Sequence, residues 1–227
     1  MATDQNDDTK RVDEWLAGFG GRVARPQTPE ERKRAIAEMC AAGADRLFPL
    51  LVPVLMGPDP EARCAACEAV LRIDARGAIE LVLPLLNDPD RTVRWQACGC
   101  LHDFGDERAV VPLIRVLQGD PDPQVRNTAA YALGGIGSPA AIPALLAALE
   151  SDHELDELGY STSSSAKTAL DDILGTNETR IRFPDGLCKM QERPPDLERL
   201  KRLARETYEE WSKRQAEADA AADGGDR

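Results

Sequence analysis

The chain has 227 residues, of which 42% are hydrophobic and only 4% aromatic, and its formal net charge is −12 at pH 7. Nucleic-acid affinity rests mainly on Lys and Arg that neutralise phosphates, so this charge and the few aromatics argue against a nucleic-acid partner. No apolar run reaches the length of a membrane span, and the N-terminus lacks the basic and then apolar order of a signal peptide. We therefore expect a cytoplasmic protein whose six cysteines stay reduced.

The first predicted helix covers Lys10–Phe19, after a polar start (residues 1–9) that we expect to be disordered. Val12, Trp15 and Leu16 recur there at helical spacing, and glycines follow. We interpret this segment as the N-terminal capping helix of a larger array.

Four segments then superimpose at steps of 31 or 32 residues, and they cover residues 28–57, 58–87, 88–119 and 120–151. An arginine recurs at one position of each segment: Arg32, Arg63, Arg94 and Arg126. Four residues before each arginine stands a residue whose side chain can cap a helix: Thr28, Asp59, Asp90 and Asp122. A small core residue follows in each: Ala35, Ala66, Ala97 and Ala129. Such a period indicates a solenoid, in which no repeat can bury its apolar face without its neighbours.

Each repeat contains a second helix. The first helix ends where a glycine can adopt a left-handed conformation, at Gly43, Gly105 and Gly137. The predicted second helices are Asp45–Met56, Arg76–Leu86, Glu107–Leu117 and Pro139–Leu149. Pro53 and Pro84 lie deep enough to kink or shorten theirs. The predicted fold is all-α: a right-handed α-solenoid of stacked antiparallel helix pairs, spanning residues 10–175.

The period is interrupted after the fourth repeat. Residues 152–175 form a degenerate fifth repeat, with a helix at Ser165–Leu174 after a long connection from Ser151 to Ser164. The connection is rich in acids, which is typical of a hydrated loop, yet loops inserted in solenoids commonly lie at binding faces. We therefore take it and the following Ser161–Ser165 as the leading interaction candidate. Its candidate partner-binding residues are Asp152, His153, Glu154, Asp156 and Glu157.

The C-terminal part changes character. In residues 176–195, Ile181 and Phe183 alternate with arginines before a Pro-Asp-Gly turn, which predicts a small β-hairpin near residues 180–190. A capping helix is predicted for residues 196–215, and residues 216–227 are expected to be a disordered tail.

Two repeated residue types allow a structural and a functional interpretation. The arginines either bridge to an acid of the neighbouring repeat, as a ladder, or bind an anionic ligand; regular repetition favours the ladder. Cys64, Cys67, Cys98 and Cys100 either bind a metal or pack in the core. Cys67 and Cys98 share the repeat position of Ala130, which favours packing, so we expect no metal and no cofactor.

Trp95, Asn127 and Tyr131 lie just outside the apolar stripe. Trp95 and Asn127 share one repeat position, so these residues are candidates for one edge of the solenoid that contacts a partner, because Tyr and Trp commonly anchor interfaces. Packing against the adjacent repeat is the alternative.

The segment Asp120–Leu149 resembles the short HEAT-like repeat of phycobilin lyase subunits and of many bacterial HEAT-repeat proteins. Asp88–Leu117 is a looser copy, and Pro58–Leu86 and Thr28–Leu55 are weaker ones. The resemblance implies a protein-interaction scaffold, or alternatively a bilin lyase or isomerase subunit that acts on a chromophore-bearing protein.

A third functional class that uses such repeats is an enzyme like deoxyhypusine hydroxylase, whose repeats place His-Glu before the paired alanines to ligate iron. The matching dipeptides here are Lys33-Arg34, Cys64-Ala65, Trp95-Gln96 and Asn127-Thr128, and none is His-Glu. We therefore expect a non-catalytic monomer that binds another protein. The acidic composition favours a basic partner.

Overall fold

The computed structural model describes residues 44–73, 75–176, 181–182, 188–189 and 197–224. The chain forms two compact units, of which the first ends at Ala109 and the second begins at Val110. The capping helix expected at Lys10–Phe19 and the first helix of the first repeat lie outside the described residues.

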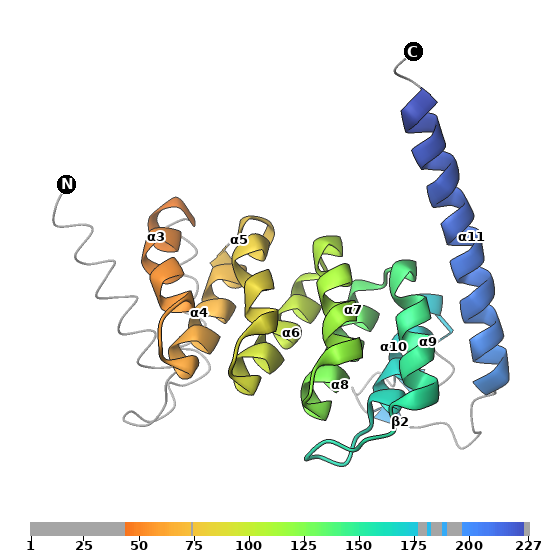
Figure 1. Cartoon of the computed structure of the whole chain (residues 1–227), viewed down its shortest axis with the longest axis horizontal. Coiled ribbons are helices and arrows are strands. Elements are labelled where there is room, and N and C mark those ends of the chain that lie inside the picture. Colours follow the sequence, from red (N-terminus) through yellow and green to blue (C-terminus); the bar gives the residue numbers. More distant parts are fainter. Residues whose placement is uncertain (1–43, 74, 177–180, 183–187, 190–196, 225–227) are drawn as a thin grey trace. The chain divides into compact units, whose positions relative to one another are not determined.

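The first unit is a stack of short helices. Its elements are α3 (Ala44–Leu55), α4 (Pro60–Ile73), α5 (Ala75–Val82), the 3-10 helix η1 (Leu83–Asn87), α6 (Arg91–Phe104) and the 3-10 helix η2 (Glu107–Ala109). Helix α4 packs against α3, α5 and α6, and α6 also packs against η1 (Figure 1).

The second unit continues the same pattern. Its helices are α7 (Val110–Gly119), α8 (Pro123–Ile136), the 3-10 helix η3 (Pro139–Ala141), α9 (Ile142–Ser151), α10 (Thr162–Leu174) and α11 (Leu197–Gly224). Helix α8 packs against α7 and α10, and α9 packs against α10 and α11. The predicted all-α architecture of stacked helix pairs is confirmed within each unit.

Helices α6 and α8 begin and end where the repeat predicts. The carboxylate of Asp90 accepts the N–H of Thr92 at 2.7 Å, and that of Asp122 accepts the N–H of Gln124 at 2.9 Å. Both aspartates therefore cap the first turn of their helix. At the other ends, Gly105 and Gly137 adopt the left-handed conformation and close α6 and α8.

The core consists of small and aliphatic side chains at equivalent repeat positions. Ala66, Ala97 and Ala129 have no exposed surface, and neither have Val70, Leu101 and Leu133, which follow one turn later. The predicted alanine positions are thus core positions, and their small size lets neighbouring helices approach closely.

The second helices differ from the expected single α-helices. Pro84 has no N–H to donate, so α5 stops at Val82 and the chain continues as η1. The segments expected to begin at Glu107 and Pro139 open with the 3-10 turns η2 and η3 before α7 and α9.

The predicted hairpin near residues 180–190 is confirmed as a short antiparallel pair. Strand β1 (Ile181–Arg182) pairs with β2 (Cys188–Lys189), with Ile181 opposite Lys189.

Two predicted boundaries after the repeats were wrong. Helix α10 begins at Thr162 rather than at Ser165, because the side chain of Ser161 caps it. Helix α11 extends to Gly224, so the disordered tail expected from Ala216 is helical over most of its length. Alanine has the highest helix propensity, and the alanines of this segment sustain the helix. The buried side chains of Leu200 and Ala204 anchor the first turns of α11.

Helices α8 and α10 approach each other so closely that Gly134 has no room for a side chain. A Cβ atom there would lie 2.7 Å from the Cα and 2.9 Å from the Cβ of Ala169. We expect Gly134→Ala to lower the free energy of unfolding by about 1–3 kcal/mol, because overpacking forces the backbones apart. Urea unfolding followed by circular dichroism would measure this.

The matched control is Gly99→Ala on α6, where a Cβ would meet no atom within 4 Å. Helix propensity predicts that this substitution stabilises by about 0.5–1 kcal/mol. If both substitutions stabilise to the same extent, the close approach of α8 and α10 does not exist in solution.

Candidate functional site

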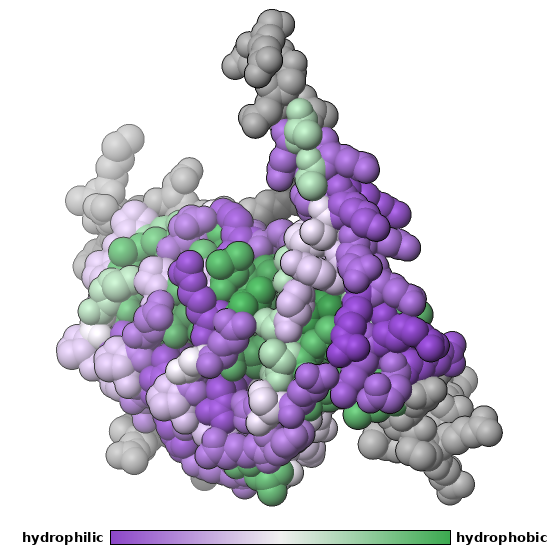
Figure 2. All heavy atoms as spheres, turned by 45° about the vertical axis from the view of Figure 1, so that its right-hand side comes forward, coloured by the Kyte–Doolittle hydropathy of each residue, from purple (hydrophilic) through white to green (hydrophobic). Residues whose placement is uncertain are grey.

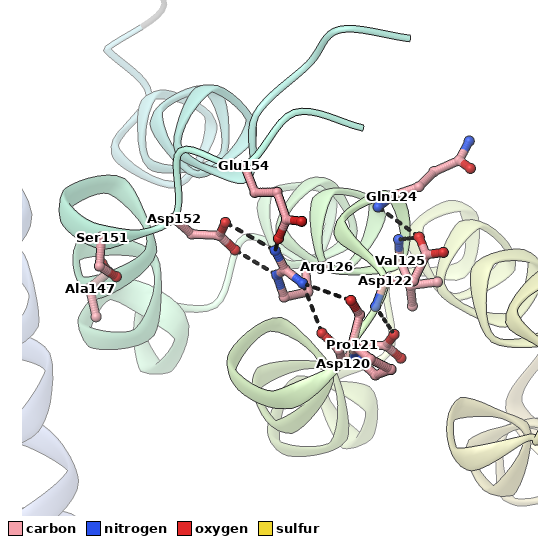
Figure 3. Close-up of polar contacts among 10 residues, drawn as sticks. All are labelled: Asp120, Pro121, Asp122, Gln124, Val125, Arg126, Ala147, Ser151, Asp152 and Glu154. Atoms are coloured by element: carbon pink, nitrogen blue, oxygen red, sulfur yellow. Dashed lines mark hydrogen bonds and ion pairs between the residues drawn. The ribbon is translucent and has the colours of Figure 1, made fainter. Parts of the chain in front are cut away.

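Arg126 joins the start of α8 to the connections on either side of the repeat (Figure 3). Its Nε and Nη2 donate to the carboxylate of Asp152 at 2.6 and 3.1 Å, and Nη2 also donates to Glu154 at 2.8 Å. Its Nη1 donates to the carbonyls of Asp120 at 2.9 Å and Pro121 at 3.4 Å. These contacts use all five guanidinium N–H groups. The hydrogen bond to Asp152 is the main reason that the pKa of Arg126 is raised.

The first unit contains the same junction. Arg63 donates from Nε and Nη2 to Asp88 at 2.8 and 2.7 Å, and from Nη1 to the carbonyl of Gly57 at 2.8 Å. Arg94 repeats the carbonyl contact, donating to the backbone oxygen of Asp88 at 3.0 Å. The ladder interpretation is confirmed for Arg63 and Arg126, since each binds the acid at the start of the next repeat, Asp88 or Asp152.

The sequence analysis did not identify which carboxylates accept from Arg63 and Arg126; the structure shows that they are Asp88 and Asp152. Asp88, Asp120 and Asp152 recur at intervals of 32 residues, and the first two stand two positions before the capping residues Asp90 and Asp122. In the first two, a carboxylate oxygen also accepts the N–H of the cap residue, Asp90 or Asp122, at 2.8 and 2.9 Å. Their regular spacing is the signal in the sequence that marks these positions.

Asp152 binds Arg126 as Asp88 binds Arg63, although the chain after Asp152 no longer follows the repeat. The connection between α7 and α8 consists of residues 120–122, whereas the one between α9 and α10 consists of residues 152–161. We call residues 152–161 the insertion loop. Figure 1 shows it as a narrow projection between α9 and α10. Its two ends are joined, because the N–H of Ser163 donates to the carbonyl of Asp152 at 2.8 Å.

Asp156 organises the projecting part of the insertion loop. Its carboxylate accepts the N–H groups of Leu158 and Tyr160, both at 2.9 Å, and its own N–H donates to the carbonyl of Tyr160 at 2.8 Å. Gly159 completes the turn with a φ of 81°, and Leu155 bridges to Ser161. The loop therefore has a defined hairpin-like backbone.

Asn127 fastens this hairpin to α8. It is buried, and its Nδ2 donates to Asp156 at 2.9 Å. Burial alone would raise the pKa of Asp156, but the N–H of Tyr160 and the amide of Asn127 lower it below its ordinary value. The candidate contact residue Asn127 thus lies inside the unit and supports the loop rather than facing solvent.

The side chains that the loop presents to solvent are largely apolar. Leu155, Leu158 and Tyr160 are 62%, 71% and 60% exposed. They are three of the eight large hydrophobic side chains exposed within the described residues, and they stand within six positions. Sequence reasoning missed them because it considered only the charges; the signal was the Leu-x-x-Leu-x-Tyr pattern in a segment that has no core position in the repeat.

The candidate acidic residues divide into two groups. Asp152 and Asp156 turn inward and bind Arg126 and the loop backbone, whereas Glu154, Glu157 and His153 are exposed. Burial would raise the pKa of Asp152, but the hydrogen bond and charge of Arg126 lower it. Both inward carboxylates are therefore ionised at neutral pH.

The serine run belongs to the helix rather than to the loop surface. Ser161 Oγ accepts the N–H of Ser164 at 3.2 Å, Thr162 is fully buried, and Ser163 Oγ donates to the carbonyl of Leu149 at 2.9 Å. These residues start α10 and seat it on α9.

The remaining candidate aromatics lie on helices. Trp95 is 41% exposed on α6 of the first unit, and Tyr131 is 42% exposed on α8 of the second. Both are partly accessible, but neither belongs to the insertion loop.

The cysteines have mainly structural surroundings. Cys67, Cys98 and Cys100 are buried, and Cys64 is half-buried on the wall of a pocket of about 440 Å³. Burial raises the pKa of the Cys64 thiol to about 11, so it is protonated at neutral pH. Within the described residues, no group of three or more His, Cys, Asp or Glu side chains is arranged to hold a metal ion.

Comparison with known proteins agrees with this architecture. Residues 79–157 match the family model for HEAT repeats, which covers parts of both units and most of the insertion loop. This region is therefore similar to HEAT repeats. The match is to the general repeat and does not single out the phycobilin lyase type. No curated protein matches the chain.

Solved structures show the same fold. The crystal structure of Kap121p is similar with a TM-score of 0.54 at 20% identity, over 75% of this chain and 21% of that protein, and a mutant of Kap121p gives the same values. The chain thus spans about a fifth of the length of Kap121p, and at this identity the likeness concerns the fold alone. An engineered protein is 19% identical over 90% of this chain and 97% of its own, with a TM-score of 0.46.

In the described part of the chain, no helix is both long and apolar enough to cross a bilayer.

Replacing Arg126 by Lys tests the junction. Lysine keeps the charge but cannot make the two-pronged contact with Asp152 while also binding the carbonyl of Asp120. We expect a loss of about 1–3 kcal/mol in the free energy of unfolding, measured by urea denaturation. The control is Arg115→Lys at an exposed site on α7, which should change stability by less than about 0.5 kcal/mol. Equal effects of the two substitutions would contradict the junction role.

The pH dependence of stability tests the role of Asp156. A carboxylate whose folded pKa lies below its unfolded value of about 3.9 stabilises the fold above that value and loses this effect as the pH falls through the folded pKa. The stability difference between wild type and Asp156→Asn should therefore be largest above about pH 5 and shrink below about pH 4. Urea unfolding at a series of pH values measures it.

Asp172→Asn on α10 serves as the control and should show a smaller difference from wild type at neutral pH. A difference for Asp156→Asn that grows on acidification would mean that the carboxylate is not held as described.

Proposed function

We propose that this protein is a non-catalytic protein-binding module and that its insertion loop is the contact surface. The observation that carries the proposal is the ordered display of Leu155, Leu158 and Tyr160 on a projection from the helix stack. Exposed apolar side chains gathered in one place, beside polar residues, are characteristic of interaction sites.

The order of the loop supports binding because it lowers the entropic cost of association. Arg126 holds the base of the loop through Asp152 and Glu154, and Asn127 holds its middle through Asp156. A loop fixed in this way loses little conformational freedom when a partner covers it.

The exposed part of α11 offers less to a partner of this kind. Every side chain from Ser212 to Ala220 is exposed, and Figure 2 shows the projecting helix as mainly hydrophilic. Tyr208 and Trp211 are only partly exposed and lie near each other, with ring centroids 5.7 Å apart.

The polar groups also favour binding over catalysis. Arg126, Asp152 and Asp156 direct their hydrogen bonds to the protein itself. The thiol of Cys64 is a poor nucleophile at neutral pH, since the thiolate is the reactive form.

The double substitution L155S/L158S tests the proposal. Burying an apolar side chain of this size contributes about 1.5–3 kcal/mol, so partner affinity should fall at least about tenfold. The measurement is quantitative affinity purification from the native cell with the immobilised full chain, combined with cross-linking to locate the contacts.

The matched control is M56S/V111S, which removes two apolar side chains of similar exposure outside the insertion loop. It should retain the same proteins as wild type, and both variants should unfold at nearly the wild-type temperature. Equal retention by all three proteins, or cross-links that avoid residues 152–161, would refute the proposal.

A further inference from the structure

Two cysteine side chains from neighbouring repeats meet between α4 and α6, which pack against each other. Cys67 of α4 and Cys100 of α6 are both buried, and the thiol of Cys67 donates a hydrogen bond to the sulfur of Cys100. A disulfide forms only between cysteines whose side chains point towards each other at short range, and two hydrogen-bonded thiols meet this condition.

Packing does not require sulfur at either position. In other repeats, Ala130 stands at the position of Cys67, and Ala69 and Ala132 stand at the position of Cys100. All three alanines are buried, so a methyl group is sufficient for the core there. The meeting of two thiols between α4 and α6 therefore has no explanation in the repeat itself.

The two thiols differ in acidity. The hydrogen bond from Cys67 lowers the pKa of Cys100 against the effect of burial, and the amide of Gln96 lowers it further by donating to Sγ at 3.4 Å. The same hydrogen bond, together with burial, raises the pKa of Cys67. Because the thiolate is the reactive form, Cys100 is the sulfur that attacks first, and Cys67 is the one that follows.

A pocket of about 440 Å³ gives small molecules access to this region. Cys64 of α4 and Gln96 of α6 both line it, and Gln96 also contacts the sulfur of Cys100. The amide side chain of Gln96 thus stands between the pocket and Cys100, which is 5% exposed. Burial raises the pKa of the Cys64 thiol to about 11, so Cys64 does not compete for an electrophile that enters the pocket.

We propose that Cys67 and Cys100 are a reversible oxidation site, at which a small hydroperoxide converts the two thiols into a disulfide that joins neighbouring repeats. The site lies in the first unit and does not depend on the proposed role of the insertion loop. The disulfide closes the chain segment that contains α5 and η1, and it prevents α4 and α6 from separating.

Hydrogen peroxide balances the reaction. The Cys100 thiolate attacks one oxygen, the O–O bond breaks, and the departing hydroxide takes up the proton that the thiol had lost, which leaves a sulfenic acid and water. The sulfur of Cys67 then attacks the sulfenic sulfur, and its proton leaves with the hydroxyl group as a second water. Two thiols and one peroxide thus give one disulfide and two waters, and a reducing thiol reverses the step by thiol–disulfide exchange.

Peptide mapping after mild oxidation tests the proposal. The reduced full-length chain is treated with a small excess of hydrogen peroxide, its remaining thiols are blocked with N-ethylmaleimide, and the tryptic digest is analysed by mass spectrometry without reduction. We expect peptide Cys64–Arg72 to be cross-linked to peptide Trp95–Arg108 and to be released by dithiothreitol. Fragmentation of the cross-linked pair should locate the bond at Cys67 and Cys100.

Single alanine variants identify the sulfur atoms independently. Cys67→Ala and Cys100→Ala should lower the yield of the cross-linked pair at least about tenfold, whereas the matched controls Cys64→Ala and Cys98→Ala should change it less than about twofold. Because alanine occupies the positions of Cys67 and Cys100 in other repeats, the first two variants should keep the circular dichroism spectrum of wild type.

Three results would contradict the oxidation site. N-ethylmaleimide on both Cys67 and Cys100 after peroxide treatment would mean that the pair is inert. A bond between Cys64 and Cys67, or a sulfinic acid at Cys100 without a cross-link, would mean that the two thiols do not react with each other. Cross-linking that is no faster in the folded chain than in urea would mean that the fold does not bring them together.

Discussion

The arginine at the fixed repeat position is the constraint on which the rest of each unit depends. A helix of 14 residues such as α8 is barely stable alone in water, so its position must come from contacts with its neighbours. Arg63 and Arg126 supply such contacts by binding a carbonyl of the preceding connection and a carboxylate at the start of the next repeat. A largely buried guanidinium that lost these acceptors would be costly, which fixes the register of successive repeats.

The parts of the fold that follow from local rules could be predicted from the sequence. Capping by Asp90 and Asp122, the glycine ends of α6 and α8, and the buried alanines all depend on neighbours a few residues away. The sequence predicted that each arginine binds an acid of the neighbouring repeat, but it did not identify which acid accepts the hydrogen bonds. Identifying Asp88 or Asp152 requires the path of the chain between repeats, which no local pattern records.

The interruption of the period drew the prediction to the insertion loop, but the sequence did not show that two of its five candidate residues turn inward. The acids Asp152 and Asp156 turn inward because Arg126, Asn127 and the loop's own N–H groups offer them hydrogen bonds. The leucines turn outward because those bonds leave them no place in the core. The usual rule of apolar inside and charged outside therefore fails at this loop, and such local failures are expected at functional sites.

Both ends of the insertion loop are fixed to the helices by hydrogen bonds. Asp152 completes the contact that Arg126 makes at its end of the repeat, and Ser161 and Ser163 start the next helix and seat it on α9. Residues 153–160, between these two ends, contribute little to the stacking of the helices. Substitutions at Leu155, Leu158 and Tyr160 should therefore leave the helices in place, whereas Glu154 and Asp156 must be kept because they bind Arg126 and Asn127.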